Sequence, residues 1–472
     1  MDWSYPLRAA CERHPRRVAL RHGARSLTFA ELEEEVSALA AGLAARGLAG
    51  ATVAWMLPNA PEAVVTALAL ARVGAVAVPL NDRLTDEELA FIADDAGVEL
   101  QIGGAGGVAV EELRGVADPW RAWAVDDDAI ATSIYTSGTT GFPKGVLRTH
   151  RANAWNVVNS ALGDPRAVGD VELFTLPAFG IGLLHFALPA LLGGATVVLD
   201  GAFDAERAWA LLGSGEVTRT FLAPTMMSAM LAVDGHERHD LSALRTVCTA
   251  YELGDGLRAR VLARFGDVFT YMYGLTEAQL TCTRPGDFTA KPGSVGGAMG
   301  ALRIRILDGA GAPLPAGEVG EIALEGPALM AGYHERPEET AAALRDGWLR
   351  TGDLGLVDAD GDLHYRGRLK EMIKTGGFSV DPREVEHVLA AVDGVADAAV
   401  LGVPDEHWGE MVVAFVATGG AAVQEAALLA ACRTHLAGYK VPKQVRLLDA
   451  LPLNATGKVA RGALRAAYRA VG

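Results

Sequence analysis

Apolar residues in the first third of the chain follow two alternating patterns. After Thr28 and Glu31, which have the spacing of a capping box, apolar positions recur with helical periodicity until Gly47. Residues 52–57 form a short, continuous apolar run, and residues 61–74 return to a helical pattern. Continuous runs of this length are typical of parallel strands that are buried on both faces. The alternation predicts βαβ units and an α/β fold with a doubly wound, largely parallel sheet.

The same alternation returns after residue 150 and changes near residue 293. In this middle part, helices are expected at 151–162, from Gly182, at 225–232 and at 256–265. Beyond residue 293, short apolar runs are separated by Gly, Asp and Pro, which favours an antiparallel β subdomain.

The C-terminal part has the pattern of a separate, small α/β unit. Helices are expected at 384–392 and 424–436, and strands at 397–404 and 411–418. We therefore expect two domains, one covering residues 1–369 and one covering residues 370–472.

Composition narrows the class of protein. The chain has 472 residues, of which 50% are hydrophobic and 21% charged, so large cores can form. A formal charge of −16 argues against sequence-independent nucleic-acid binding, which needs a basic face. The four cysteines lie far apart, with no metal-ligand or disulfide spacing. No apolar run reaches the roughly 18–20 residues that span a bilayer. We expect a cytoplasmic protein with no membrane span and no nucleic-acid partner.

Residues 135–145, YTSGTTGFPKG, form the most informative segment of the chain. Small hydroxyl residues and glycines let backbone N–H groups approach phosphate oxygens, and Lys144 adds a mobile positive charge. The spacing differs from that of a GxxxxGK[ST] P-loop. The segment predicts a phosphate cradle; the alternative is a solvated Gly/Thr turn.

This segment resembles the signature of adenylate-forming enzymes, which include acyl-CoA synthetases, luciferases and peptide-synthetase adenylation domains. Further segments resemble the motifs of that family in the family's order, at 271–277, 349–354, 365–377 and 452–458. The resemblance implies a large N-terminal domain of doubly wound sheets plus a β subdomain, holding the ATP and acyl sites. It also implies a small, mobile C-terminal α/β domain. The implied reaction is that of an AMP-forming acid–thiol ligase. A carboxylic acid and ATP, with Mg²⁺, give an acyl-adenylate and pyrophosphate, and coenzyme A then gives acyl-CoA and AMP.

The same resemblance implies an ATP site built from several segments. Its members are Thr136, Ser137, Gly138, Thr139, Thr140, Gly141, Lys144, Tyr273, Gly274, Thr276, Asp353, Tyr365 and Arg368. Tyr273 would pack on the adenine, Asp353 would bind the ribose, and Arg368 would contact ribose or phosphate. Glu277, a hard oxygen ligand, would hold Mg²⁺. The alternatives are a core aromatic at Tyr273, a surface salt bridge at Arg368, and a Glu277 that caps a helix beginning at Ala278.

The resemblance implies that a different lysine serves each of the two half-reactions. Thr276 and Glu277 are the other implied catalytic residues. Lys458 would offset the charge that builds on the α-phosphoryl oxygens when the carboxylate attacks. Rotation about a hinge at Lys370 would then replace Lys458 with the face that carries Lys374. Glycines on that face would line the coenzyme A tunnel, at Gly376 and Gly377. The alternative is that Lys370 and Lys374 share one face of a solvated helix.

The expected acyl pocket departs from the family pattern. Its predicted members are Phe179, Gly180, Gly182, Tyr251, Met272 and Gly274. Acyl-CoA synthetases commonly have His at the position of Gly180. Tyr251 and Met272 replace smaller residues and would fill volume that the glycines leave open, so we expect a reshaped pocket. The alternative is unrelated drift in packing. Near residue 180 there is no Asp of the kind that binds an amino-acid amine, which argues against an α-amino acid substrate.

Two other functions stay open at this point. One is transfer of the acyl group to a carrier-protein thiol or to an amine, and the other is a non-catalytic nucleotide-binding protein. Two further patterns are weak. Residues 104–109 with Asp126 imitate a dinucleotide fingerprint in too short a unit, and His236 with His239 lacks a third metal ligand.

Overall fold

The computed structural model describes most of the chain. The described residues are 2–118, 123–136, 143–250, 253, 255–278, 281–376, 378–405, 407–453 and 459–471. The chain divides into two compact units, and each is described by itself. The first comprises 1–251, 264–304 and 323–350, and the second comprises 252–263, 305–322 and 351–472. The expected boundary at residues 369 and 370 stays a prediction.

The first unit contains a six-stranded sheet in the order β17-β7-β6-β4-β3-β5. Its strands are β3 (Thr52–Met56), β4 (Val76–Pro79), β5 (Leu100–Gly103), β6 (Ile130–Thr136), β7 (Lys144–Thr149) and β17 (Gly332–Tyr333). The pairs β3–β5, β3–β4 and β4–β6 are parallel, whereas β6–β7 and β7–β17 are antiparallel. The continuous apolar runs therefore lie in the parallel centre of the sheet, as predicted.

A second, nine-stranded sheet in the same unit has the order β14-β13-β12-β11-β10-β8-β9-β1-β2. Its strands are β1 (Val18–His22), β2 (Arg25–Thr28), β8 (Val171–Phe174), β9 (Thr196–Leu199), β10 (Arg219–Phe221), β11 (Thr246–Thr249), β12 (Phe269–Tyr273), β13 (Thr281–Cys282) and β14 (Gly297–Ala298). The run from β1 through β12 is parallel, and antiparallel pairs close both ends. This arrangement confirms the predicted doubly wound α/β fold.

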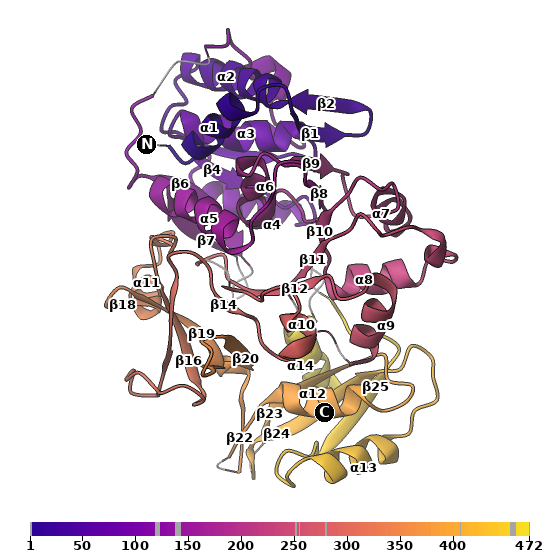
Figure 1. Cartoon of the computed structure of the whole chain (residues 1–472). Coiled ribbons are helices and arrows are strands. Elements are labelled where there is room, and N and C mark those ends of the chain that lie inside the picture. Colours follow the sequence, from indigo (N-terminus) through magenta and orange to yellow (C-terminus); the bar gives the residue numbers. More distant parts are fainter. Residues whose placement is uncertain are drawn as a thin grey trace. The chain divides into compact units, whose positions relative to one another are not determined.

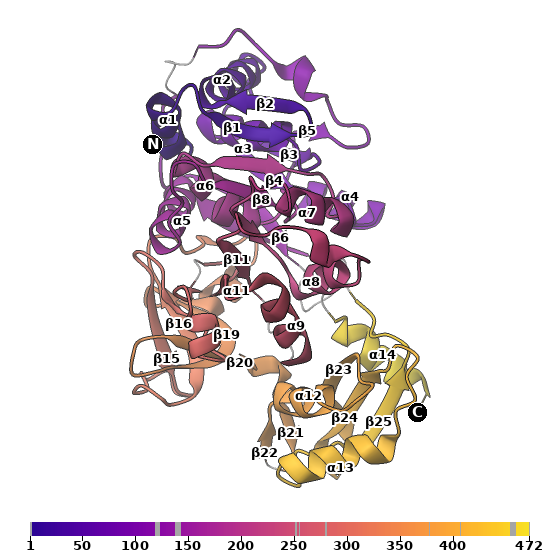
Figure 2. The same ribbon diagram turned by 45° about the vertical axis from the view of Figure 1, so that its right-hand side comes forward.

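Helices flank these two sheets in Figures 1 and 2. They are α1 (Tyr5–Arg13), α2 (Phe29–Ala45), α3 (Pro61–Arg72), α4 (Asp86–Asp95), α5 (His150–Gly163), α6 (Leu188–Leu192), α7 (Ala205–Leu212) and α8 (Pro224–Leu231). The first unit also contains α10 (Asp287–Ala290) and α11 (Pro337–Ala343), whereas most of α9 (Asp255–Phe265) belongs to the second unit. The predicted capping box at α2 is present, since Thr28 accepts from the Glu31 backbone and the Glu31 side chain accepts from the Thr28 backbone. The main apolar core lies between α2, α3, α6 and the strands beneath them.

The predicted antiparallel β subdomain is a five-stranded sheet in the order β15-β16-β19-β18, with β20 beside β19. Its strands are β15 (Arg303–Leu307), β16 (Gly320–Glu325), β18 (Leu344–Arg345), β19 (Trp348–Val357) and β20 (Leu363–Arg368).

The predicted C-terminal α/β pattern is also present. There β21 (Ile373–Thr375), β22 (Phe378–Val380), β23 (Asp397–Asp405), β24 (Gly409–Ala417) and β25 (Gln444–Leu448) form a sheet, and the helices are α12 (Pro382–Ala390), α13 (Glu425–His435) and α14 (Arg461–Val471).

The helix expected from Gly182 is present, although Leu183–Ala187 form a π-helical turn, η2, before α6 begins at Leu188. Pro189 explains part of this, because it has no N–H to donate to the carbonyl of His185. The alternative of a helix with Lys370 and Lys374 on one face is wrong. Lys374 lies in a strand, and Lys370 lies in the short 3-10 turn Leu369–Glu371.

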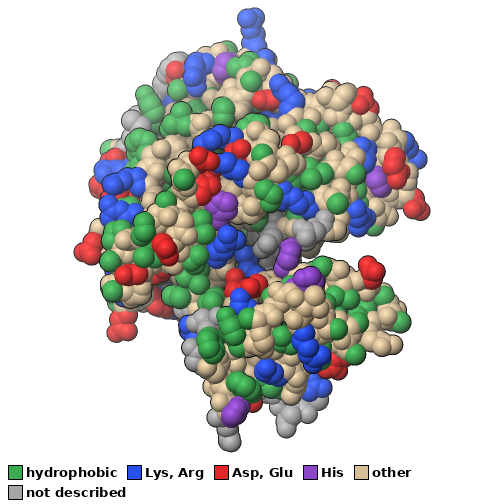
Figure 3. Space-filling view, turned by 60° about the horizontal axis from the view of Figure 1, so that its bottom comes forward, with side chains coloured by type: hydrophobic (Ala, Val, Ile, Leu, Met, Phe, Trp, Pro, Cys, Tyr) green, Lys and Arg blue, Asp and Glu red, His purple; other side chains and the backbone are tan. Residues whose placement is uncertain are grey.

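On the face drawn in Figure 3, acidic and basic side chains are interspersed. Within the part of the chain that the structure describes, no helix combines the length and apolar character needed to cross a membrane.

Candidate active site

The predicted phosphate-cradle segment lies between two paired strands. β6 ends at Thr136 and β7 begins at Lys144, and these two residues are opposite each other in the ladder. A Cβ at Gly145 would lie 2.6 Å from Ser133 Oγ and 3.0 Å from the Tyr135 ring, so a side chain there would displace these neighbours. Tyr135 in turn donates a hydrogen bond to Asp95 at 2.6 Å. The hairpin therefore holds the two ends of the segment together. Five expected phosphate contacts lie outside the described residues: Ser137, Gly138, Thr139, Thr140 and Gly141.

Lys144 and Glu277 meet through Tyr333, which the sequence did not single out. The Lys144 Nζ lies 3.5 Å from the centre of the Tyr333 ring and 3.4 Å from Glu339 Oε2. The Tyr333 hydroxyl donates to Glu277 Oε1 at 2.9 Å. Strand β17 places Tyr333 here because it pairs with β7, with Tyr333 opposite Val146. We call Lys144, Glu277, Tyr333 and Glu339 the Glu277 cluster.

Electrostatics fix the direction of the hydrogen bond inside this cluster. Burial and then the negative charge of Glu277 raise the pKa of Tyr333 well above its ordinary value. Tyr333 therefore keeps its proton at neutral pH and acts as the donor. The Glu277 side chain accepts this hydrogen bond, and the Glu277 backbone carbonyl separately accepts from the Met330 N–H at 2.8 Å.

A buried arginine holds the loop that carries Thr276. Arg148 is fully buried, and its guanidinium donates to the Thr276 carbonyl at 2.9 Å and the Ala328 carbonyl at 2.9 Å. A third bond reaches Asn153 Oδ1 at 2.8 Å. Burial lowers the pKa of Arg148 to about 10, against the opposing charge of Glu277, so the side chain stays cationic at neutral pH. Arg148 therefore links the strand after the cradle to the Thr276–Glu277 segment.

The donor set of the cluster fits a magnesium ion. Mg²⁺ takes hard oxygen ligands and is commonly held by one or two carboxylates together with substrate phosphates. Tyr333 engages Oε1 of Glu277, and no described residue donates a hydrogen bond to Oε2. Glu277 could therefore supply a carboxylate oxygen to the cation while Tyr333 fixes the orientation of the side chain. The alternative of a helix beginning at Ala278 is wrong, since residues 275–278 form a turn and β13 begins at Thr281.

Strand β12 leads directly into this turn. Met272 is 1% exposed and belongs to the main core, and Tyr273 is 8% exposed. The Tyr273 backbone pairs with Thr281 on β13. Gly274 follows the end of the strand. The expected adenine contact of Tyr273 and the acyl contacts of Met272 and Gly274 stay predictions, as does the alternative of Tyr273 as a core aromatic.

The glycines of the expected acyl pocket have different surroundings. A Cβ at Gly182 would lie 2.8 Å from the Leu176 side chain, whereas at Gly180 the nearest atom would be the Pro177 carbonyl oxygen at 3.6 Å. Gly180 lines a small cavity of about 30 Å³. Phe179 precedes it and is partly exposed. Tyr251 lies outside the described residues.

The second unit contains the expected ribose site. Asp353 on β19 is opposite Arg368 on β20, and Arg368 Nε lies 3.2 Å from Asp353 Oδ1. Asp353 is 2% exposed, whereas the Arg368 side chain is half exposed. Tyr365 lies under the Arg383 guanidinium, at 4.3 Å from the ring centre. Burial, followed by the charge of Asp353, raises the pKa of Tyr365 to about 12. The two strands thus bring Asp353, Tyr365 and Arg368 together, and their contacts with a nucleotide stay predictions.

The residues expected to serve the thiol step lie at β21. The Lys374 backbone N–H donates to Glu410 Oε2 at 2.6 Å. Gly376 has φ +55°, and a Cβ there would lie 3.2 Å from the Trp408 ring, so glycine is favoured here by conformation and space alone. Its expected role in a coenzyme A tunnel stays a prediction. Gly377, Lys458 and the side chain of Lys370 lie outside the described residues.

Three residues of the site escaped the sequence analysis. A signal existed for Arg148, a charged residue inside the apolar strand that follows the cradle. Tyr333 and Glu339 gave none, because their two-residue strand and short helix are too brief to produce a periodic pattern.

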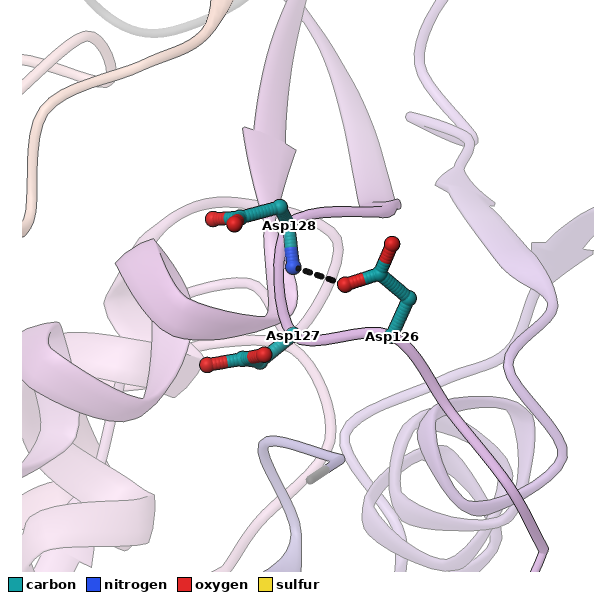
Figure 4. A group of neighbouring side chains, drawn as sticks. All are labelled: Asp126, Asp127 and Asp128. Carbon is teal, nitrogen blue, oxygen red and sulfur yellow. Dashed lines mark hydrogen bonds between the residues drawn. The ribbon is translucent and has the colours of Figure 1, made fainter.

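Structural explanations exist for the three aspartates at 126–128 and for the histidine pair. Figure 4 shows Asp126, Asp127 and Asp128 on one turn, where Asp126 accepts from the Asp128 backbone at 3.0 Å. Asp127 and Asp128 both pair with Arg151, so this cluster needs no cation. The rings of His236 and His239 stack on Trp209 at 5.4 and 5.7 Å between centres.

Comparison with known proteins gives consistent matches over the whole chain. The family model described as AMP-binding enzyme matches residues 7–334, and that of the AMP-binding enzyme C-terminal domain matches residues 384–458. A feruloyl-CoA synthase of Amycolatopsis sp is 40% identical over 483 residues, covering 98% of both chains. An indoleacetate–CoA ligase of Aromatoleum aromaticum is 36% identical, covering 96% of this chain and 95% of the relative.

Solved structures agree with these relatives. ATP-bound MatB from Rhodopseudomonas palustris is 29% identical, with a TM-score of 0.92 and full coverage of both chains. The β6–β7 hairpin, the Glu277 cluster and the Asp353–Arg368 pair thus occur in a chain that both family models match. The chain belongs to the AMP-binding, adenylate-forming enzyme family.

Proposed function

We propose that the protein is an AMP-forming acid–thiol ligase that activates an aromatic carboxylic acid and transfers it to coenzyme A. The observation that carries this proposal is the Glu277 cluster, in which Tyr333 joins the lysine of the cradle hairpin to a carboxylate from a distant segment. A cation and a magnesium-type ligand at one place fit the polyphosphate of ATP. The names of the two relatives support an aromatic acid and a coenzyme A acceptor.

In the first half-reaction, the acid's carboxylate attacks the α-phosphorus of ATP. A bond forms between a carboxylate oxygen and phosphorus, the bond to the bridging oxygen breaks, and pyrophosphate leaves. Lys144 would hold the outer phosphates, and Lys458 would offset the charge on the α-phosphoryl oxygens. Mg²⁺, bound through Glu277, would neutralise phosphate charge. Asp353 would accept hydrogen bonds from the ribose hydroxyls, with Arg368 holding its carboxylate.

In the second half-reaction, the thiolate of coenzyme A attacks the acyl carbon. The carbon–sulfur bond forms and AMP leaves with the carboxylate oxygen that it received. Rotation about Lys370, which would bring Lys374 to the site, is part of this proposal. A cytoplasmic location, where ATP and coenzyme A are available, belongs to it as well.

The direct test is pyrophosphate release by the purified protein over a panel of acids, with and without coenzyme A. We expect release that depends on the acid, and multiple turnovers with aromatic acids only when coenzyme A is present. The proposal would be overturned if, for every acid tested, the rate of pyrophosphate release equals the rate without acid. Acid-dependent release that coenzyme A does not accelerate would favour a carrier-protein thiol or an amine as acceptor.

A further inference from the structure

A turn between β17 and α11 connects two members of the Glu277 cluster. Tyr333 is the last residue of β17, and Glu339 lies on α11, so the turn separates them in sequence. The turn also contacts the β6–β7 hairpin, because the His334 N–H donates to the Gly145 carbonyl at 2.8 Å. Gly145 follows Lys144 directly. The position of this turn on the hairpin therefore affects how the members of the cluster are arranged.

The turn contains a residue in an unfavourable backbone conformation. Glu335 has φ +47°, and among the non-glycine residues that the structure describes only Asp346 shares a positive φ. A residue with a side chain persists in this left-handed region where its surroundings impose the conformation. Here the Arg336 guanidinium donates to the Glu335 carbonyl at 3.3 Å. The side chain of Arg336 therefore helps to hold the turn in its unfavourable form.

Arg336 and the hairpin share a partner, the Asp95 carboxylate. Arg336 Nη2 donates to Oδ1 at 3.4 Å, and the Tyr135 hydroxyl donates to Oδ2 at 2.6 Å. The Asp95 side chain is only 11% exposed, so solvent screens these contacts less than it would at the surface. Burial, and then the hydrogen bond to Asp95, raise the pKa of Tyr135, which therefore remains a donor at neutral pH. One carboxylate thus ties strand β6 of the hairpin to the turn.

Helix α4 itself does not explain an acidic residue at the position of Asp95. Asp95 is the last residue of α4, directly after Asp94, and the last turn of this helix carries no basic side chain. Negative charge at a helix C-terminus is unfavourable, because the carbonyl ends of the peptide dipoles point there. Asp94 is exposed, whereas the Asp95 carboxylate accepts from Tyr135 and Arg336. The contacts of Asp95 therefore lie with the hairpin and the turn.

We propose that Asp95 is a positioning residue for the nucleotide site. It holds the hairpin and the turn in one arrangement, and through them it places Lys144 beside Tyr333 and Glu277. This inference rests on the proposed function, in which Lys144 holds the outer phosphates and Glu277 binds Mg²⁺. Loss of the Asp95 contacts should therefore weaken the binding of MgATP and leave the KM for the acid unchanged.

The test measures the Kd of MgATP by isothermal titration calorimetry of the full chain in the absence of acid. Asp95→Asn removes the charge and keeps the size of the side chain. Asp94→Asn is the matched control, with the same change of charge on the exposed neighbour. We expect Kd to rise about 5- to 10-fold in Asp95→Asn and to stay within about 2-fold of the native value in Asp94→Asn.

A second variant tests whether Asp95 acts through the hairpin. Tyr135→Phe removes only a hydroxyl and should also raise Kd. Combined with Asp95→Asn, it should raise Kd by less than the product of the two single effects, because both substitutions break the same contact. Independent, multiplicative effects would contradict a shared contact.

A partial loss of folding has a different signature from a positioning defect. Misfolded protein lowers the number of MgATP sites per chain and leaves the Kd of the remaining sites at the native value. A native Kd in Asp95→Asn would overturn the positioning role. If that variant does not fold, a native Kd in Tyr135→Phe would overturn it instead.

The two readouts also separate this inference from the proposed function. If an acid releases pyrophosphate but Asp95→Asn has the native Kd and the native KM for ATP, the positioning role fails and the ligase function stands. If no acid releases pyrophosphate, the ligase function fails, and the Kd comparison alone decides the role of Asp95. A native protein that binds no MgATP would overturn both.

Discussion

At the scale of single residues, the Tyr333 side chain makes two different contacts in the site. Its ring lies against the Lys144 ammonium, and its hydroxyl orients the Glu277 carboxylate. A cation over an aromatic ring is stabilised by the ring's quadrupole, so the ring favours the position of the Lys144 ammonium in this cluster. Tyr333 therefore links the lysine and the carboxylate.

Replacing Tyr333 by Phe separates the two roles, because the ring stays and only the hydroxyl is lost. Hydrogen bonds to a charged group contribute about 1.5–3 kcal/mol. We expect the Mg²⁺ concentration for half-maximal pyrophosphate release to rise about 10-fold or more. Tyr333→Ala, which also removes the ring from Lys144, should weaken ATP binding in addition. An unchanged Mg²⁺ titration in Tyr333→Phe would contradict the role assigned to the hydroxyl.

Gly180 allows a test of the pocket at the same scale. We expect Gly180→Trp to fill space at the edge of the small cavity that Gly180 lines and to reduce kcat/KM for large aromatic acids more than for small acids. The measurement is pyrophosphate release over acids of graded size. Equal loss for every acid would contradict the placement of Gly180 in the acyl pocket.

At the scale of elements, the π-helical turn η2 carries a buried histidine. Asn156 Nδ2 and His185 Nε2 lie 3.1 Å apart, and burial lowers the pKa of His185 to about 3, with the nearby charge of Arg148 acting in the same direction. In the unfolded chain, histidine titrates near 6.5. The folded protein therefore binds fewer protons than the unfolded chain as pH falls below that value.

This difference predicts a loss of stability in acid. Between pH 6.5 and about pH 4, His185 should lower the free energy of unfolding by about 1.4 kcal/mol per pH unit. The slope, measured by urea unfolding at several pH values, should become shallower by that amount in His185→Gln. His150→Gln should remove a further, similar contribution down to about pH 4, because burial also lowers the pKa of His150, to about 4. Equal slopes for the native protein and His185→Gln would contradict this account.

The sequence predicted some helices and strands more accurately than others. Long periodic segments such as α2 and continuous apolar runs such as β3 were predicted to within a residue or two, because their periodicity and burial both appear in sequence. The strand β17 and the π-helical turn were not predicted. A two-residue strand forms only because a distant strand pairs with it, and a π-helical turn depends on local packing around Pro189. Glu277 and Lys144 could be predicted from motifs. Their link through Tyr333 could not, because it depends on β17.

At the scale of the whole molecule, the proposal assigns the two half-reactions to different lysines. We expect Lys458→Ala to reduce acyl-AMP formation about 100- to 1,000-fold, because one charge-stabilising contact in the transition state is lost. Thioester formation from supplied acyl-AMP should stay close to the native rate.

The matched variant is Lys374→Ala, with the opposite expectation. It should slow the thioester step with supplied acyl-AMP and leave pyrophosphate release in the absence of coenzyme A close to native. Single-turnover assays of each half-reaction provide both measurements. Equal losses in both half-reactions for both variants would contradict the assignment of one lysine to each step.

The pairing of β19 with β20 constrains how this part of the chain can vary. Asp353 faces Arg368 only because the ladder skips one residue, since Leu354 is opposite Gly367 and Gly355 is opposite Tyr365. The connection between the strands, residues 358–362, sets where the pairing begins. Among homologous sequences that keep the carboxylate and the guanidinium, this connection should therefore accept many substitutions but few insertions or deletions. A change in length there would separate the two charges while leaving both side chains in place in the sequence.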